Sequence, residues 1–147
     1  MPVEVSDWHV DLVRTFLRQD DGKLKPMLGQ MPRTYEVDGT GVLLWAAFVE
    51  ATFRRFPDGN VADIIRFVAH VRIRRGRNAP PISPAAAEKL IISALTATEA
   101  DGLTDLEKGQ HIILLSELIE DEALTDAQLD AFLDVARTHA KHIAASL

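Results

Sequence analysis

Val42-Leu43-Leu44-Trp45-Ala46-Ala47-Phe48-Val49 is the stretch that decides the expected fold, because it is apolar without a break. It belongs to residues 41–56, whose apolar spacing predicts a helix. A helix with almost no polar face must be covered on all sides by protein. We therefore expect this helix either at the centre of the fold or as half of a dimer interface, with Leu44, Trp45 and Phe48 as candidates for self-association. The apolar run is also far shorter than the roughly 20 residues that a helix needs to cross a bilayer.

Helical spacing continues over the rest of the chain, and no stretch shows the sustained alternation of polar and apolar residues that a half-buried strand needs. Ser83 before Pro84 is a helix start signal, and Thr104 and Thr125 each open a capping box. Residues 22–40 carry two prolines and are expected to be a loop that packs onto the protein. We predict six helices, at approximately residues 7–19, 41–56, 61–75, 84–98, 105–122 and 126–145.

Length and composition favour a single compact all-α domain over residues 1–147. Hydrophobic residues make up 47% of the chain and charged residues 26%, which is ordinary for a globular protein. A chain of this length buries roughly 70% of the surface that it exposes when unfolded. Residues 78–82, Asn-Ala-Pro-Pro-Ile, favour an extended backbone. They join two three-helix halves, residues 1–77 and 83–147, which are candidate sub-units.

Charge is divided between two blocks of opposite sign. Residues 54–77 hold seven arginines against two aspartates, a balance of +5, whereas residues 99–134 hold eleven carboxylates against one lysine, a balance of −10. The whole chain carries a net charge of −6. Opposite charge in separate blocks indicates electrostatic attraction, either within one molecule or between two.

Basic residues of the predicted helix 61–75 and the residues just after it are the binding candidates. Several of them share one helix face, and we expect the opposite face, which includes Val61 and Ile65, to be the inner one. Such a stripe could contact an acidic protein surface or a nucleic-acid backbone, although cations in a last helical turn also complement the helix dipole. Because the protein is acidic overall and lacks interleaved aromatic residues, we rank a protein partner first and nucleic acid second. The candidates are Arg66, His70, Arg72, Arg74, Arg75 and Arg77.

Two acidic features also call for interpretation. Asp126, Asp130 and Asp134 recur at every fourth position, which suits a divalent cation, a basic partner or a solvated helix face. Residues 99–107, Glu-Ala-Asp-Gly-Leu-Thr-Asp-Leu-Glu, resemble the acidic Asp-Gly helix entry of tellurite-resistance-type helical domains. The resemblance covers some ten residues and its glutamate spacing is one residue shorter, so no expectation of activity is taken from it.

Motifs for catalysis and for metal or cofactor binding are missing from the sequence. The chain has no cysteine, which removes disulfides, thiolate nucleophiles and thiolate metal sites. No histidine has matched ligands at the spacing of a known metal site, and no nucleophile elbow or phosphate-binding fingerprint is present. We expect no catalysis, no metal and no cofactor.

These observations favour a non-catalytic helical protein that mediates protein–protein interaction and associates with itself, as a homodimer. The alternative is a nucleic-acid-associated regulator that binds through the Arg66–Arg77 cluster. A third class, a helical protein that binds a small molecule or a metal, would need a pocket between helices. Residues 1–7 have neither a basic nor an apolar leader pattern, so we expect a cytoplasmic protein without a membrane partner.

Overall fold

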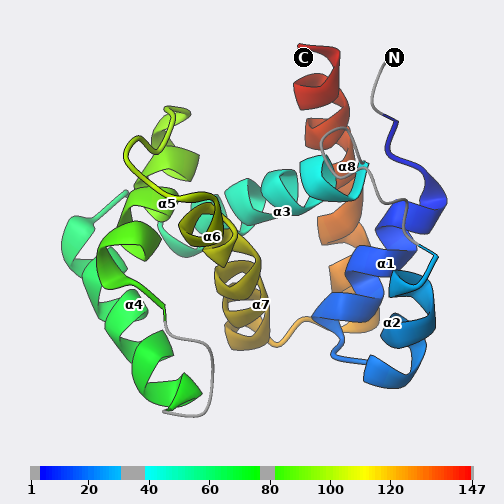
Figure 1. Cartoon of the computed structure of the whole chain (residues 1–147), viewed down its shortest axis with the longest axis horizontal. Coiled ribbons are helices and arrows are strands. Elements are labelled where there is room, and N and C mark those ends of the chain that lie inside the picture. Colours follow the sequence, from blue (N-terminus) through cyan, green and yellow to red (C-terminus); the bar gives the residue numbers. More distant parts are fainter. Residues whose placement is uncertain (1–3, 31–38, 77–81, 147) are drawn as a thin grey trace.

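The computed structural model describes residues 4–30, 39–76 and 82–146, and within these ranges it contains helices and no strand (Figure 1). The predicted all-α class is confirmed. No helix in the described ranges is both long enough and apolar enough to span a membrane. The helices are α1 (Asp7–Leu17), α2 (Asp21–Leu28), α3 (Gly39–Arg55), α4 (Val61–Arg75), α5 (Pro84–Thr96), α6 (Asp105–Lys108), α7 (Gln110–Glu122) and α8 (Asp126–Ala145).

Two local features differ from the expected six helices. Part of the expected loop at residues 22–40 forms α2, because the Asp20 side chain accepts the backbone N–H of Lys23 and the buried Met27 anchors the helix. The expected helix 105–122 is divided into α6 and α7 at Gly109, and glycine has the lowest helix propensity after proline. The remaining residues of the expected loop, 31–38, lie outside the described ranges.

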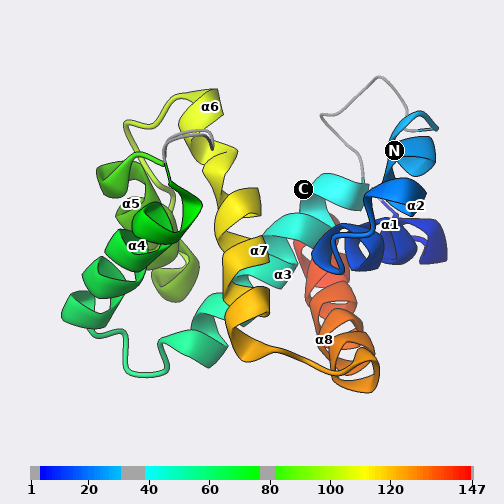
Figure 2. The same ribbon diagram turned by 90° about the horizontal axis from the view of Figure 1, so that it is seen from below.

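Helix α3 is the central helix of the fold. It crosses between a group formed by α1, α2 and α8 and a group formed by α4 and α5 (Figures 1 and 2). It packs against α8, α7, α1 and α5. Leu43, Ala46, Ala47, Phe48 and Ala51 are completely buried, so other helices cover this helix on several sides. The apolar run was expected either at the centre of the fold or in a dimer interface, and in the structure it lies at the centre of the fold.

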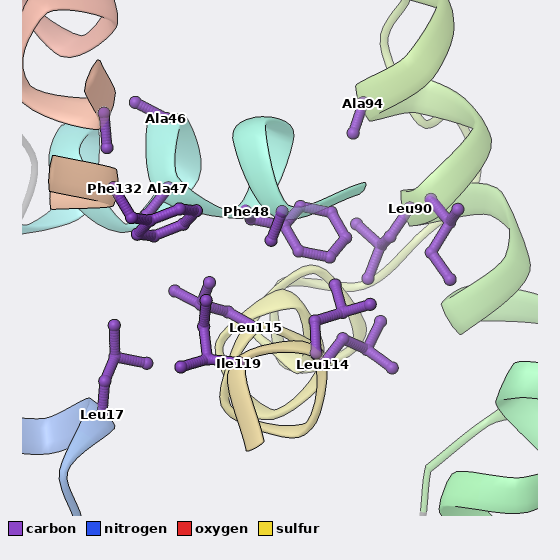
Figure 3. Close-up of a cluster of buried hydrophobic side chains, with 14 of the residues drawn as sticks. Leu17, Ala46, Ala47, Phe48, Leu90, Ala94, Leu114, Leu115, Ile119 and Phe132 are labelled. Carbon is purple, nitrogen blue, oxygen red and sulfur yellow. The ribbon is translucent and has the colours of Figure 1, made fainter. Parts of the chain in front are cut away.

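Helix α7 supplies the other side of the core under α3. Leu114 and Leu115 are completely buried and lie next to Phe48 of α3 and Leu90 of α5 (Figure 3). Ile119, one turn further along α7, lies toward Phe132 of α8 (Figure 3). Aliphatic and aromatic side chains from four helices therefore pack together at the centre of the molecule.

Helices from the two halves of the sequence pack against each other. Helix α1 contacts α8, and α4 contacts α5. One cluster of buried hydrophobic side chains includes residues of α1, α3, α4, α5, α7 and α8. Residues 78–81 of the proline-containing connection lie outside the described ranges. The core is therefore built jointly by helices that precede and follow this connection.

Candidate protein-interaction surface

Helix α4 presents its buried face to α5 and its opposite face to solvent. Asn60 caps its start by accepting the backbone N–H groups of Ala62 and Asp63, and Gly76, at φ +70°, follows its end. The buried side chains are Ile64, Phe67, Val68 and Val71.

The expected inner face of α4 was partly wrong. Val61 is 55% exposed and Ile65 is 48% exposed, although both were placed on the inner face. Helix α4 packs against α5 through a face centred near Phe67 and Val71, so the real inner face is rotated around the helix axis. The residues that border the buried face therefore differ from those expected from the sequence.

Arg74 and Arg75 lie at the edges of this buried face and form ion pairs with α7. Arg74 Nη2 lies 2.5 Å from Glu117 Oε2, and Arg74 Nη1 donates a hydrogen bond of 2.5 Å to Asp121 Oδ1. Arg75 Nη1 lies 3.6 Å from Glu117 Oε1. The hydrogen bond to Asp121 and the negative charge of Glu117 raise the pKa of Arg74 above its ordinary value. These two arginines connect α4 to α7 within the molecule.

The other members of the basic cluster differ in their surroundings. Arg66 pairs with Asp63 one turn earlier on the same helix. His70 and Arg72 are exposed, and neither side chain has an ion pair or hydrogen bond with another described residue. Arg77 lies outside the described ranges. The structure therefore leaves Arg66, His70 and Arg72 on the solvent side of α4.

Other arginines also pair with carboxylates of the acidic block inside the molecule. Asp126 and Asp130, two of the three regularly spaced aspartates of α8, form ion pairs with Arg18, which follows α1, and with Arg14 of α1. Among the described residues, no group of three metal-binding side chains could hold a metal ion. The hydrogen bonds to Glu122 raise the pKa of Arg54. Three of these arginine–carboxylate pairs are Arg14–Asp130 at 2.7 Å, Arg18–Asp126 at 2.8 Å and Arg54–Glu122 at 2.7 Å.

The three candidates for self-association on α3 take part in internal packing. Phe48 is completely buried. Leu44 and Trp45 are half-buried and pack against the core. Phe48 therefore contributes to the core of this molecule rather than to an exposed face.

An exposed apolar row runs along the outer face of α4. We call Val61, Ile65, Ala69 and Ile73 the α4 outer row, because each residue follows the previous one by four positions and all are exposed. Ile73 is 79% exposed. Arg66, His70 and Arg72 lie among these residues on the same helix, and α4 forms one edge of the molecule in both views (Figures 1 and 2).

Sequence reasoning missed the α4 outer row although its signal was present. The helix has more large apolar residues than one face can hold, so two inner faces were compatible with the pattern.

Comparisons of the chain with protein-family models, with curated proteins and with solved structures find no match.

Proposed function

We propose that this chain is a non-catalytic protein that binds an acidic, amphipathic helix of a partner protein along the α4 outer row. The carrying observation is the exposure of Val61, Ile65 and Ile73 in one row beside Arg66 and Arg72. Single exposed apolar residues are common on proteins, but several in one continuous row are typical of an interaction site. Binding in the cytoplasm is part of this proposal.

Charge supports an acidic partner. Arg72 and His70 have no ion pair or hydrogen bond among the described residues, and Arg66 pairs only within its own helix. A partner helix with leucine-like side chains on one face and carboxylates at the edges of that face would fill the apolar row and pair with these cations.

A second copy of the chain fits this surface less well. The α4 outer row is symmetric about Ala69, so an antiparallel copy would place Ile65 against Ile73 of the second copy. Such a pair would bring Arg66 and Arg72 of both copies to the edges of one contact, and this accumulation of like charge opposes association. The row also spans only about 18 Å at 1.5 Å per residue, which is short for a stable dimer interface.

The sequence ranks binding of duplex nucleic acid second. Fewer arginines are free to contact phosphates than the sequence suggested. Arg74 and Arg75 contact Glu117, so a phosphate backbone would have to compete with a carboxylate for each of them.

Fluorescence anisotropy with two labelled synthetic helical peptides tests the proposal. One peptide carries leucines on one face with flanking glutamates, and the other has lysines in place of the glutamates. We expect only the acidic peptide to bind, and we expect the variant I65S/I73S to weaken its binding by at least about tenfold. The matched control is L106S/V135S, which removes two other exposed apolar side chains.

Four results would contradict the proposal. The first is equal binding of the two peptides, and the second is equal weakening by L106S/V135S. The third is binding of labelled duplex DNA instead of the peptides, with a steep loss as salt increases, which would establish the nucleic-acid function. The fourth is a dimer by light scattering that I65S/I73S converts to a monomer, which would make a second copy the occupant.

A further inference from the structure

A cleft of about 740 Å³ lies among α3, α5, α7, α8 and the segment between α5 and α6. This volume is within the usual range for small-molecule sites in proteins. Its walls are mostly apolar and include Trp45 and Phe53 of α3, Leu90 and Ala94 of α5 and Ile143 of α8. The cleft does not overlap the α4 outer row, so a ligand here would be independent of the proposed partner.

Carboxylates outnumber cations among the residues that line the cleft. Glu99 and Asp101 line it, and neither has an ion pair with another described residue. Lys108 is the single lysine or arginine in the described lining. Lys89, whose Nζ lies near Gly102, is not among the lining residues. Two unpaired carboxylates beside an apolar cleft are complementary to a ligand that carries a positive charge.

His111 forms part of the wall as a neutral imidazole. Its Nδ1 lies 2.7 Å from the carbonyl oxygen of Lys108, and because a carbonyl only accepts, Nδ1 carries the proton. Burial lowers the pKa of His111 from its ordinary value. The ring packs edge-on against Trp45, with 5.4 Å between the ring centroids. The wall beside Trp45 therefore has no cation of its own at neutral pH.

We propose that this cleft binds a small organic cation with an apolar, ring-sized body. The body would lie against Trp45, Phe53 and Ile143, and the ammonium group would lie near Glu99 and Asp101. An aromatic indole such as Trp45 also attracts a cation placed over its face. Among the described residues, no group of three metal-binding side chains could hold a metal ion in place of this ammonium group.

Three small molecules that share a phenylethyl body but differ in charge test this proposal: 2-phenylethylamine, 2-phenylethanol and 3-phenylpropanoate. Trp8 and Trp45 are the two tryptophans of the chain, so the variant W8F makes the fluorescence of Trp45 a reporter of the cleft. Titrations are made at pH 8, where ordinary histidines are neutral. We expect the amine to bind about fivefold to tenfold more tightly than the alcohol, and the carboxylate to bind weakest.

The variant E99Q/D101N should remove the preference for the amine while the alcohol binds as before. Its matched control is E120Q/D134N, which removes two exposed carboxylates outside the cleft and gives the same net charge. Circular dichroism establishes that both variants are folded. Equal binding of the three compounds would overturn the proposal, as would an equal effect of the two variants. Absence of heat in calorimetry with excess amine, together with an unchanged Trp45 signal, would also overturn it.

Discussion

The carboxylate of Glu117 lies between two arginines of α4, and its side chain is only 9% exposed. A buried charge destabilises a protein unless an opposite charge compensates it. Arg74 provides that compensation at 2.5 Å, and Arg74 is itself only 30% exposed. At the scale of the residue, part of the arginine cluster therefore stabilises the fold. The sequence alone had suggested that Arg74 and Arg75 were available to a partner.

We predict that Arg74→Gln lowers the free energy of unfolding by about 3 kcal/mol, because it leaves Glu117 without its nearest cation. The matched control is Arg66→Gln on the same helix. Arg66 is exposed and pairs only with Asp63 within α4, so its loss should change stability by less than about 0.5 kcal/mol. Urea denaturation followed by circular dichroism measures both values. Equal stability of the two variants would show that the pair with Glu117 is not stabilising.

At the scale of the element, α3 carries two phenylalanines in opposite environments. Phe48 is completely buried between α5 and α7 (Figure 3). Phe53 is 49% exposed near the end of the helix. Two phenylalanines on the same helix thus have different roles, one in the core and one at the surface. A run of apolar residues predicts burial of the helix, but not which residue is deepest.

We predict that Phe48→Ala lowers the free energy of unfolding by about 4 kcal/mol, through lost burial and the cavity that it leaves. Phe53→Ala should cost less than about 1 kcal/mol, because half of its side chain is already in water. Thermal and urea denaturation of the two variants supply the comparison. If Phe48→Ala were as stable as Phe53→Ala, α3 would not be the centre of the core.

At the scale of the whole molecule, part of the basic block pairs with the acidic block inside one chain. Arg54 of α3 and Arg74 of α4 pair with carboxylates of α7. Arg14 and Arg18, which lie outside the basic block, pair with carboxylates of α8. The apolar faces of α3 pack against α1, α5, α7 and α8. Intramolecular contacts therefore account for the apolar run of α3 and for part of the basic block, the two features that had favoured a homodimer.

We predict that the isolated protein is a monomer over a wide range of concentration. The reason is that the apolar run of α3 is buried and an antiparallel contact between two α4 helices would gather Arg66 and Arg72 of both copies at one contact. Multi-angle light scattering measures the mass. A concentration-dependent dimer would contradict this expectation, and its loss in I65S/I73S would locate the contact on α4.

Local signals in the sequence determined the helical class and most helix positions. The caps at Asn60, Ser83, Thr104 and Thr125 are present as helix starts in the structure, because a cap depends on residues within one turn of it. The apolar run 42–49 determined that its helix would be covered. These properties follow from neighbours along the chain, so the sequence alone is sufficient for them.

The tertiary structure decided what covers α3, which face of α4 is buried and which arginines have partners. Each of these depends on residues far apart in the sequence: Arg74 reaches Glu117 and Arg14 reaches Asp130 only because the helices pack in this arrangement. The cleft beside Trp45 also exists only between packed helices. The sequence specifies how apolar a helix is and which faces could be buried, but the rotation of each helix against its neighbours is set by the packing of the whole core.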